Sequence, residues 1–198
     1  PYILHPSQVS ESERCVAIEN DLIRFFSPNT WSIPLPRSRH DFELLSKIYN
    51  HGEILCRSGE RSHWIRALRQ GIYNMSTSSS AFIPATTATR LNPEMVRLYE
   101  SKYFHCYNHR WASYDFSARA VIDTDPSRFS VDYAVETQHY VQRDDVEERL
   151  DDLSWTFNYL IAWRDITNST NERTSIFAIL PRAGLGNNAG LLLSLIHI

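Results

Sequence analysis

Two segments of the chain place apolar side chains at helical spacing. Residues 41–49 (DFELLSKIY) combine acids in the first turn with an apolar face, and residues 144–155 (DDVEERLDDLSW) carry an apolar stripe of Val146, Leu150 and Leu153 among acids. Both patterns predict short amphipathic helices. The acids in the first turn of the second segment also suit the positive end of the helix dipole.

A polar block lies between two apolar runs in the C-terminal third of the chain. Residues 155–163 and 176–180 are largely apolar, whereas residues 164–174 (RDITNSTNERT) are rich in Thr, Asn and charged side chains. Because Thr, Asn and Ser compete for backbone hydrogen bonds and favour turns, the block is expected to be a structured loop between two strands or between a helix and a strand. The Ser-, Thr- and Ala-rich residues 76–90 are expected to form an exposed loop. Together these elements predict an α+β fold with a mixed sheet and short helices.

Length and composition are those of a globular protein. The 198 residues are 42% hydrophobic and 22% charged, enough for one ordinary domain or two small ones. The cysteines, Cys15, Cys56 and Cys106, are scattered, odd in number and contain no Cys-x-x-Cys pair. The sequence therefore predicts neither a disulfide framework nor a zinc knuckle, which is typical of the reducing cytoplasm. No apolar run reaches the roughly 18 residues that cross a bilayer, so no membrane partner is expected.

Charge is distributed unevenly along the chain. The formal net charge is −3, yet residues 54–119 carry 9 basic and 4 acidic side chains, and residues 120–163 carry 3 basic and 10 acidic ones. All basic residues except Lys47 and Lys102 are arginines. The planar guanidinium suits bidentate contacts with phosphate and guanine, although on composition alone a genome-wide preference for arginine is the better explanation.

Two short patterns raise hypotheses of metal chemistry. His105 and His109 stand four residues apart with Cys106 between them, but the string HCYNH lacks the glutamate of the His-Glu-x-x-His zinc hydrolases. Glu100 and Lys102 have the Glu-x-Lys spacing of some metal-dependent nucleases, but the upstream aspartate of such sites is not evident. Nucleophile elbows and phosphate-binding loops are absent from the sequence. We therefore expect no catalytic or metal-binding residues in this chain.

Four blocks of sequence carry a more specific pattern: residues 27–49 (SPNTWSIPLPRSRHDFELLSKIY), 62–79 (SHWIRALRQGIYNMSTSS), 98–115 (LYESKYFHCYNHRWASYD) and 163–188 (WRDITNSTNERTSIFAILPRAGLGNN). In this order they resemble the C-terminal part of large bacterial adenine-specific DNA methyltransferases of restriction-modification and phage-defence systems, of the type IIG and phage-growth-limitation kind. The resemblance implies a target-recognition domain over residues 1–193, with double-stranded DNA and an N-terminal methyltransferase domain as partners.

Members of that family transfer a methyl group from S-adenosylmethionine to N6 of adenine after flipping the base out of the duplex. Such catalysis uses a glycine-rich cofactor turn and an Asn/Asp-Pro-Pro-aromatic loop. Neither motif is present, since the sole Asn-Pro pair, Asn92-Pro93, is followed by Glu94. We expect this chain to hold no cofactor and the full-length protein to bind S-adenosylmethionine through its N-terminal domain.

DNA contacts are expected from three polar turns. Arginine pairs with guanine, and asparagine with adenine, in the commonest bidentate contacts of the major groove. His109 and Arg110 either point to DNA or tie their turn to its neighbours. The adjacent opposite charges of Arg164-Asp165 and Glu172-Arg173 can form a hydrogen-bonded clasp that holds the loop, and for Asp165 and Glu172 this role is expected rather than base contact. The candidate DNA-binding residues are Arg37, Arg39, His109, Arg110, Arg164, Asn168, Asn171 and Arg173.

Two other functions remain open from sequence. One is a protein–protein docking module within a defence complex, and the other is a metal-dependent nuclease. A continuous surface lined by arginines favours DNA recognition, whereas arginines dispersed over the molecule favour docking. The last residues, 194–198 (SLIHI), resemble translated sequencing-adapter read-through and are expected to be a non-native tail of a fragment.

Overall fold

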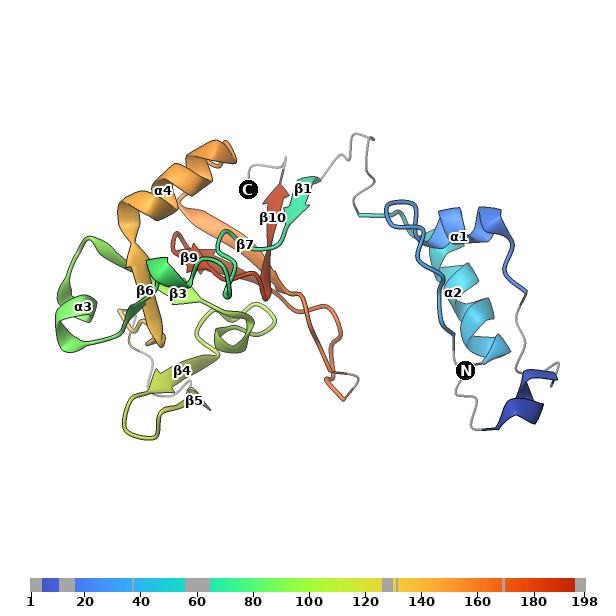
Figure 1. Ribbon diagram of the computed structural model, residues 1–198, viewed down its shortest axis with the longest axis horizontal. Coiled ribbons are helices and arrows are strands. Elements are labelled where there is room, and N and C mark those ends of the chain that lie inside the picture. Colours follow the sequence, from blue (N-terminus) through green and yellow to red (C-terminus); the bar gives the residue numbers. More distant parts are fainter. Residues whose placement is uncertain are drawn as a thin grey trace. The chain divides into compact units, whose positions relative to one another are not determined.

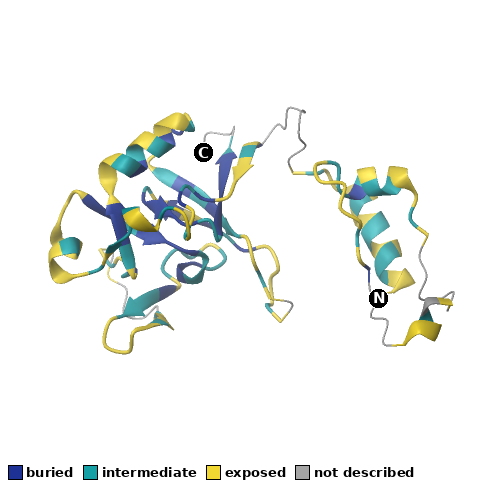
Figure 2. Cartoon of the chain, viewed as in Figure 1, coloured by how far each residue is buried: buried dark blue, intermediate teal, exposed yellow. Residues whose placement is uncertain are grey.

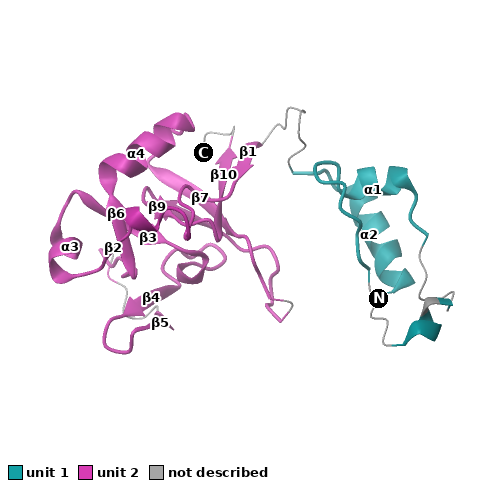
Figure 3. Ribbon diagram, viewed as in Figure 1, with its two compact units in different colours: residues 1–64 teal, residues 65–198 magenta. Residues whose placement is uncertain are grey.

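The computed structural model describes residues 5–10, 17–36, 38–55, 65–125, 130, 132–168 and 170–194. The chain divides into two compact units, residues 1–64 and 65–198 (Figure 3). The boundary lies inside the span 1–193 that the sequence assigns to one recognition domain, and that assignment stays a prediction. Of the expected tail, Ser194 ends a strand, and residues 195–198 lie outside the described residues.

The described residues of unit 1 form three short helical elements. They are the 3-10 helix η1 (Pro6–Ser10), α1 (Asn20–Phe26) and α2 (Arg39–His51). The predicted helix at residues 41–49 is confirmed as the centre of α2. Ser38 begins it as the N-cap, because its hydroxyl accepts a hydrogen bond from the backbone N–H of Asp41 at 3.1 Å.

A small aromatic cluster joins the helices of unit 1. Phe26 of α1 is 5% exposed, and its ring meets those of Phe42 and Tyr49 of α2 at centroid distances of 5.7 and 5.0 Å. Both contacts are edge-to-face, the geometry favoured by the aromatic quadrupole. Phe26, together with Phe25, whose ring lies 5.9 Å from that of Tyr49, therefore packs α1 against α2.

Unit 2 contains an antiparallel sheet of four strands in the order β1-β10-β7-β8. The strands are β1 (Ile65–Arg69), β10 (Ala189–Ser194), β7 (Tyr159–Arg164) and β8 (Phe177–Pro181). Along β7, Leu160 and Ala162 are buried and the alternate residues are partly exposed. This period of two is that of a strand with one face against the core.

A second sheet has the order β2-β6-β3-β9. Its strands are β2 (Ile83–Pro84), β6 (His139–Gln142), β3 (Met95–Tyr99) and β9 (Gly184–Leu185), and β3 pairs with β9 in parallel. A separate hairpin joins β4 (Ala112–Asp115) to β5 (Ala120–Asp123). Parallel and antiparallel pairs in one sheet, together with short helices, confirm the predicted α+β fold with a mixed sheet (Figure 1).

The helical elements of unit 2 are short. They are η2 (Ser79–Ala81), α3 (Thr87–Leu91), η3 (Ser101–Tyr103) and α4 (Arg143–Asp152). The predicted helix at residues 144–155 is confirmed as α4, which ends three residues earlier than expected. The prediction of a loop over residues 76–90 is wrong in part, because η2, β2 and α3 lie there. Thr86 caps α3 by accepting a hydrogen bond from the N–H of Thr89 at 3.1 Å.

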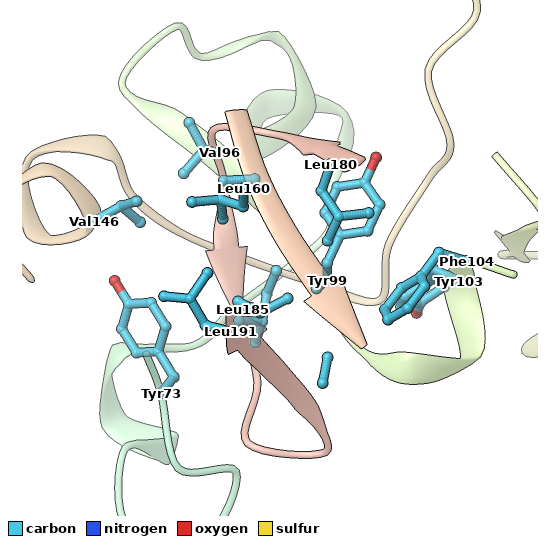
Figure 4. Packing of buried hydrophobic residues seen from close by; sticks show 14 of the residues in the cluster. Tyr73, Val96, Tyr99, Tyr103, Phe104, Val146, Leu160, Leu180, Leu185 and Leu191 are labelled. Atoms are coloured by element: carbon cyan, nitrogen blue, oxygen red, sulfur yellow. The ribbon is translucent and has the colours of Figure 1, made fainter. Parts of the chain in front are cut away.

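One apolar core fills the space between the two sheets and α4 (Figures 2 and 4). Val146 and Leu150, two of the three residues in the predicted stripe of α4, are 1% and 0% exposed. They meet strand residues such as Leu160 and Leu185, which are also fully buried. Burying side chains of this size stabilises the fold by about 1.5–3 kcal/mol each.

The segment 184–190 (GLGNNAG) connects the two sheets, because it runs from β9 directly into β10. Asn187 accepts a hydrogen bond from the backbone N–H of Met75 at 2.9 Å, and Asn188 accepts one from that of Ser101 at 3.3 Å. Its side-chain amide also donates to Glu100 at 3.3 Å. The two asparagines therefore satisfy polar groups of chain segments far apart in sequence.

Glycine is required where another segment approaches this connection. Gly71 has a φ of +54°, and a Cβ there would lie 2.5 Å from the carbonyl oxygen of Gly186. The backbone N–H groups of Ile72 and Tyr73 both donate to the carbonyl of Leu185, at 2.9 and 3.0 Å. The left-handed conformation and the close backbone contact together exclude a larger residue.

A half-buried polar network fixes α4 to the segment after β1. The hydroxyl of Tyr73 donates to Asp145 at 2.7 Å, and Arg149 donates to the other oxygen of the same carboxylate at 3.0 Å. Burial raises the pKa of Asp145, but the hydrogen bonds from Tyr73 and Arg149 outweigh it, so the pKa lies below its usual value. Burial, followed by the bond to Asp145, raises the pKa of Tyr73.

Substituting Tyr73→Phe is expected to lower the free energy of unfolding by about 1.5 kcal/mol at pH 7, because a hydrogen bond to a charged acceptor is lost. Since the folded pKa of Asp145 is depressed, this contribution is present above about pH 4 and is lost as the pH falls through the folded value. Urea unfolding of both proteins between pH 3 and pH 7 measures the difference. Tyr107→Phe, which removes a hydroxyl from an 87% exposed side chain, is the matched control. A difference that grows toward pH 3 would contradict the assignment.

Substituting Gly71→Ala is expected to destabilise unit 2 by about 2–4 kcal/mol, because the left-handed backbone and the contact with Gly186 are both strained. Thermal unfolding measures the change. Gln70→Ala alters the exposed neighbouring position and should leave the transition unmoved. Equal stability of the two variants would show that the chain relaxes at Gly71 without cost.

Candidate nucleic-acid interface

The polar block of the sequence forms the connection between β7 and β8, here named the β7–β8 loop (residues 165–176). Strand β7 ends at Arg164 and β8 begins at Phe177, and the loop extends away from the sheet (Figure 1). Its base is closed by a hydrogen bond from the N–H of Arg164 to the carbonyl of Ile176 at 3.0 Å. The expectation of a structured loop between two strands is confirmed.

Arg164 ties this loop to a second polar segment. Its Nε and Nη2 donate to the carbonyl of Phe104 at 2.9 and 2.5 Å. Burial lowers the pKa of Arg164, and the nearby carboxylate of Asp123 opposes that shift. The guanidinium of Arg164 is therefore a structural donor to a backbone carbonyl, which differs from the DNA contact that the sequence suggested.

The second segment is the turn at residues 104–111, here named the aromatic turn. His105 and Asn108 exchange backbone hydrogen bonds of 2.8 and 2.9 Å, and the N–H of Tyr107 donates to the carbonyl of Phe177 at 2.8 Å. The thiol of Cys106 lies 3.9 Å from the carbonyl of Ser175. Together with the Arg164 contact, these bonds hold the aromatic turn against the β7–β8 loop, and the two segments form the paired-loop surface.

His109 and Arg110 stabilise the aromatic turn. The Nε of Arg110 donates to the Nε2 of His109 at 3.3 Å, and its Nη1 donates to the carbonyl of Ser130 at 3.2 Å. Burial, and then the charge of Arg110, lowers the pKa of His109. Of the two roles expected from sequence, the contacts support the tying role for both residues.

An aromatic pair covers one end of the turn. The ring of His105 stacks on Trp111 at a centroid distance of 4.6 Å and an angle of 36°. Burial lowers the pKa of His105, and the charges of Arg164 and Arg173 lower it further. The imidazole is therefore neutral at pH 7, and Arg173 lies close enough to influence it.

The remaining candidates differ in their surroundings. The side-chain oxygen of Asn168 accepts a hydrogen bond from the N–H of Thr170 at 3.3 Å, and its carbonyl accepts one from the N–H of Asn171 at 3.0 Å. Arg173 is exposed and makes no hydrogen bond or ion pair with the residues that the structure describes. Arg164, one member of the expected clasp, ties the loop to the carbonyl of Phe104, and the expected role of Asp165 and Glu172 in the clasp stays a prediction.

Two candidates belong to unit 1. Arg39 is exposed in the first turn of α2. Arg37 lies outside the described residues. The structure thus assembles the six candidates of unit 2, His109, Arg110, Arg164, Asn168, Asn171 and Arg173, along the paired-loop surface.

Three residues of this surface were not predicted as contacts: His105, Tyr107 and Trp111. Tyr107 is 87% exposed and has a φ of +60°. Trp111 is 36% exposed. The density of aromatic residues in the string HCYNHRW is a sequence feature that indicates such a surface. The spacing of the two histidines and the cysteine in the same string instead suggests a metal site.

The hypothesis of a metal at residues 105–109 finds no geometry to support it. A tight turn replaces the helix on which histidines four apart would share a face, and the two imidazoles contact Trp111 and Arg110. Within the described parts of the chain, no group of three or more His, Cys, Asp and Glu side chains is arranged to hold a metal ion.

Glu100 and Lys102 of the Glu-x-Lys pattern form an ion pair with each other. Glu100 is 8% exposed, and its two oxygens meet Lys102 at 2.8 Å and the amide of Asn188 at 3.3 Å. A carboxylate engaged on both oxygens, one by a cation, is a structural group at the end of β3. The geometry offers a nuclease mechanism no free carboxylate at this position.

Arginines in unit 2 mostly bind backbone carbonyls. Among the described residues of this unit, seven guanidinium groups donate to carbonyl oxygens: Arg66, Arg97, Arg110, Arg143, Arg149, Arg164 and Arg182. Arg182 shows the pattern most fully, since it reaches the carbonyls of Trp155 and Phe157 at 3.0 and 2.6 Å and also pairs with Glu147 at 2.6 Å. The arginine bias of the sequence is therefore largely structural in this unit.

A cavity of about 600 Å³ lies along the β4–β5 hairpin. Its lining includes the rings of Tyr114 and Phe116 and the carboxylates of Asp115, Asp123 and Asp125. Negative charge at this place repels phosphate, so the cavity is unsuited to the DNA backbone.

Comparison with known proteins identifies no relative. No family model, no curated protein and no solved structure matches the chain. Among the residues that the structure describes, no helix has the length and apolar character needed to cross a membrane.

Proposed function

We propose that this chain is a DNA target-recognition region and that unit 2 contacts double-stranded DNA through the paired-loop surface. The observation that carries the proposal is the contact of Arg164 with the carbonyl of Phe104, which joins the two polar segments at the base of the β7–β8 loop. A binding surface that is already ordered loses less conformational entropy on association.

The exposed side chains of this surface match the chemistry of base recognition. Arg173 offers the planar fork that pairs with guanine, and Asn168, an exposed residue of the type that pairs with adenine, already accepts the N–H of Thr170 at 3.3 Å through its side-chain oxygen. Both lie on a loop that extends from the sheet, the kind of element on which binding groups are commonly placed. Asn171 is half-buried in the same loop and is the weaker candidate.

Charge on the paired-loop surface is mixed. Arg164 and Arg173 are balanced by nearby acids, namely Asp123, Asp165 and Glu172. Few phosphate contacts are therefore expected, and with about two of them the logarithm of the binding constant should fall with the logarithm of salt concentration at a slope of about −2. Such a region would position DNA weakly by itself.

The wider proposal follows the sequence resemblance. The chain would direct an S-adenosylmethionine-dependent adenine-N6 DNA methyltransferase of a restriction or phage-defence system to its site in the bacterial cytoplasm. Its own N-terminal domain would supply the cofactor site and the catalysis. In this proposal the present chain recognises the DNA sequence, and the N-terminal domain carries out the methyl transfer.

Protein–protein docking is the second candidate, and the arginine contacts favour it. In the part of unit 2 that the structure describes, seven guanidinium groups donate to backbone carbonyls of different segments. Such dispersed arginines do not form the continuous basic surface that a high-affinity DNA-binding protein uses. The acidic, aromatic cavity along the β4–β5 hairpin would suit a basic side chain of a partner protein.

Substituting Arg173→Ala in the full chain is expected to weaken binding of a fluorescent duplex about tenfold and to leave the melting temperature unchanged, because the side chain is exposed. Arg164→Ala is expected to lower the free energy of unfolding by about 1.5–3 kcal/mol, since the carbonyl of Phe104 loses a charged donor. Fluorescence anisotropy and thermal melting separate the two effects.

Arg69→Ala removes the same charge from an exposed position on β1 and is the matched control. Equal loss of DNA binding in the Arg69 and Arg173 variants would mean that only net charge matters. A wild-type chain that binds no duplex at low salt would refute DNA recognition and leave docking as the better proposal.

Titrating S-adenosylmethionine into the purified chain is expected to give no saturable heat, because the sequence lacks the glycine-rich cofactor turn. Isothermal titration calorimetry makes the measurement, with the same titration into buffer as the blank. A saturable signal would place a cofactor site in this chain and would overturn the proposed division between domains.

A further inference from the structure

Tyr107 is the most exposed large apolar side chain among the residues that the structure describes. Its exposed fraction is 87%, although it lies between half-buried neighbours on the aromatic turn. Its φ of +60° places it in the left-handed region, which is costly for a residue with a Cβ. The fold therefore maintains an unfavourable backbone conformation that directs a large ring into solvent.

The backbone around Tyr107 is nevertheless fixed. Its own N–H donates to the carbonyl of Phe177 at 2.8 Å, and the flanking residues His105 and Asn108 bond to each other in both directions. The side-chain oxygen of Asn108 also accepts the N–H of Arg110 at 2.8 Å. The ring is thus carried on an ordered support, and little backbone entropy remains to be lost when it binds.

The side chain of Tyr107 is not engaged by the described part of the chain. It makes no ring contact and no side-chain hydrogen bond with those residues, in contrast to the buried Tyr73, Tyr99, Tyr103 and Tyr140. Strained residues held by their surroundings are concentrated at binding sites, and a lone exposed ring on a rigid turn is suited to stacking.

The surroundings of the ring narrow the choice of ligand. The half-exposed Trp111, stacked on a neutral His105, belongs to the same turn, and Arg173 lies near His105. The acids of the paired-loop surface limit contact with phosphates. The ring therefore suits contact with the flat face of a nucleobase, and the phosphates of the same DNA make few contacts with this surface.

We propose that Tyr107 is a wedge that stacks on a nucleobase at a point where the duplex is unstacked, so that the paired-loop surface prefers DNA with a disrupted base step over intact duplex. This inference rests on the proposed function and assigns a role to a residue that base-edge recognition does not use. Apolar or aromatic side chains inserted at base steps have to unstack them, which costs a few kcal/mol. DNA whose stacking is already broken therefore binds more tightly.

The test uses the full chain and three fluorescent DNA probes of one sequence: an intact duplex, the same duplex with a single abasic site, and the single strand. The wild-type chain is expected to bind the abasic duplex about tenfold more tightly than the intact one. Tyr107→Ala is expected to abolish that preference. Its affinity for the abasic duplex should fall about tenfold, because one base–aromatic stack is lost. Tyr107→Phe, which keeps the ring, should retain the preference within about twofold.

Leu91→Ala removes a 79% exposed apolar side chain from α3 and is the control for non-specific loss of apolar surface. Melting temperatures of the Tyr107 and Leu91 variants should equal that of the wild type, because neither side chain is buried. If the wild type binds none of the probes, the proposed function itself fails. If the wild type binds but Tyr107→Ala binds all three probes equally well, or loses affinity equally for all three, only the wedge is refuted.

Discussion

The structure of unit 2 depends on the close approach of backbone segments at residues 184–190. This segment ends the second sheet and begins β10 of the first, so both sheets depend on its position. Gly71 packs on the carbonyl of Gly186, where a Cβ would be 2.5 Å away, and Gly190 lies beneath the ring of Trp163, where one would be 2.3 Å away. Asn187 and Asn188 then satisfy backbone groups of two distant segments. Because unpaired buried polar groups are costly, this arrangement is tolerated only in one conformation.

The same requirement explains the arginines. Short strands and many connections leave carbonyl oxygens without partners in regular structure, and guanidinium groups reach them from neighbouring elements. Arg182 binds two such carbonyls between α4 and β7, and Arg164 binds that of Phe104 beside the β7–β8 loop. Arginine serves this purpose well because its rigid fork presents several donors and its charge is weakly hydrated. The high arginine content, which suggests a nucleic-acid surface, thus serves in large part to donate hydrogen bonds to backbone carbonyl oxygens.

At the paired-loop surface, the contacts that stabilise the fold also position the residues proposed to bind DNA. Arg164 is held in place by a carbonyl of the aromatic turn, and the N–H of Tyr107 is held by the first residue of β8. These contacts order two segments whose polar sequences alone would favour several conformations. Ordering them leaves Arg173, Asn168 and Tyr107 exposed on a rigid support. Arg164 and Arg110 therefore act by positioning the segments that carry the exposed residues.

The sequence by itself determined the α+β class, the helices α2 and α4, and the polar loop between two strands, because local periodicity and turn propensity act over a few residues. It could not separate exposed from engaged arginines, since Arg164, Arg110 and Arg182 meet carbonyls that are distant in the chain. It also could not show that HCYNH forms a tight turn directing Tyr107 outward, because that conformation is fixed by the hydrogen bond to Phe177. Spacing in the chain predicts which side chains share an element, whereas only tertiary contacts decide which of them remain available to bind.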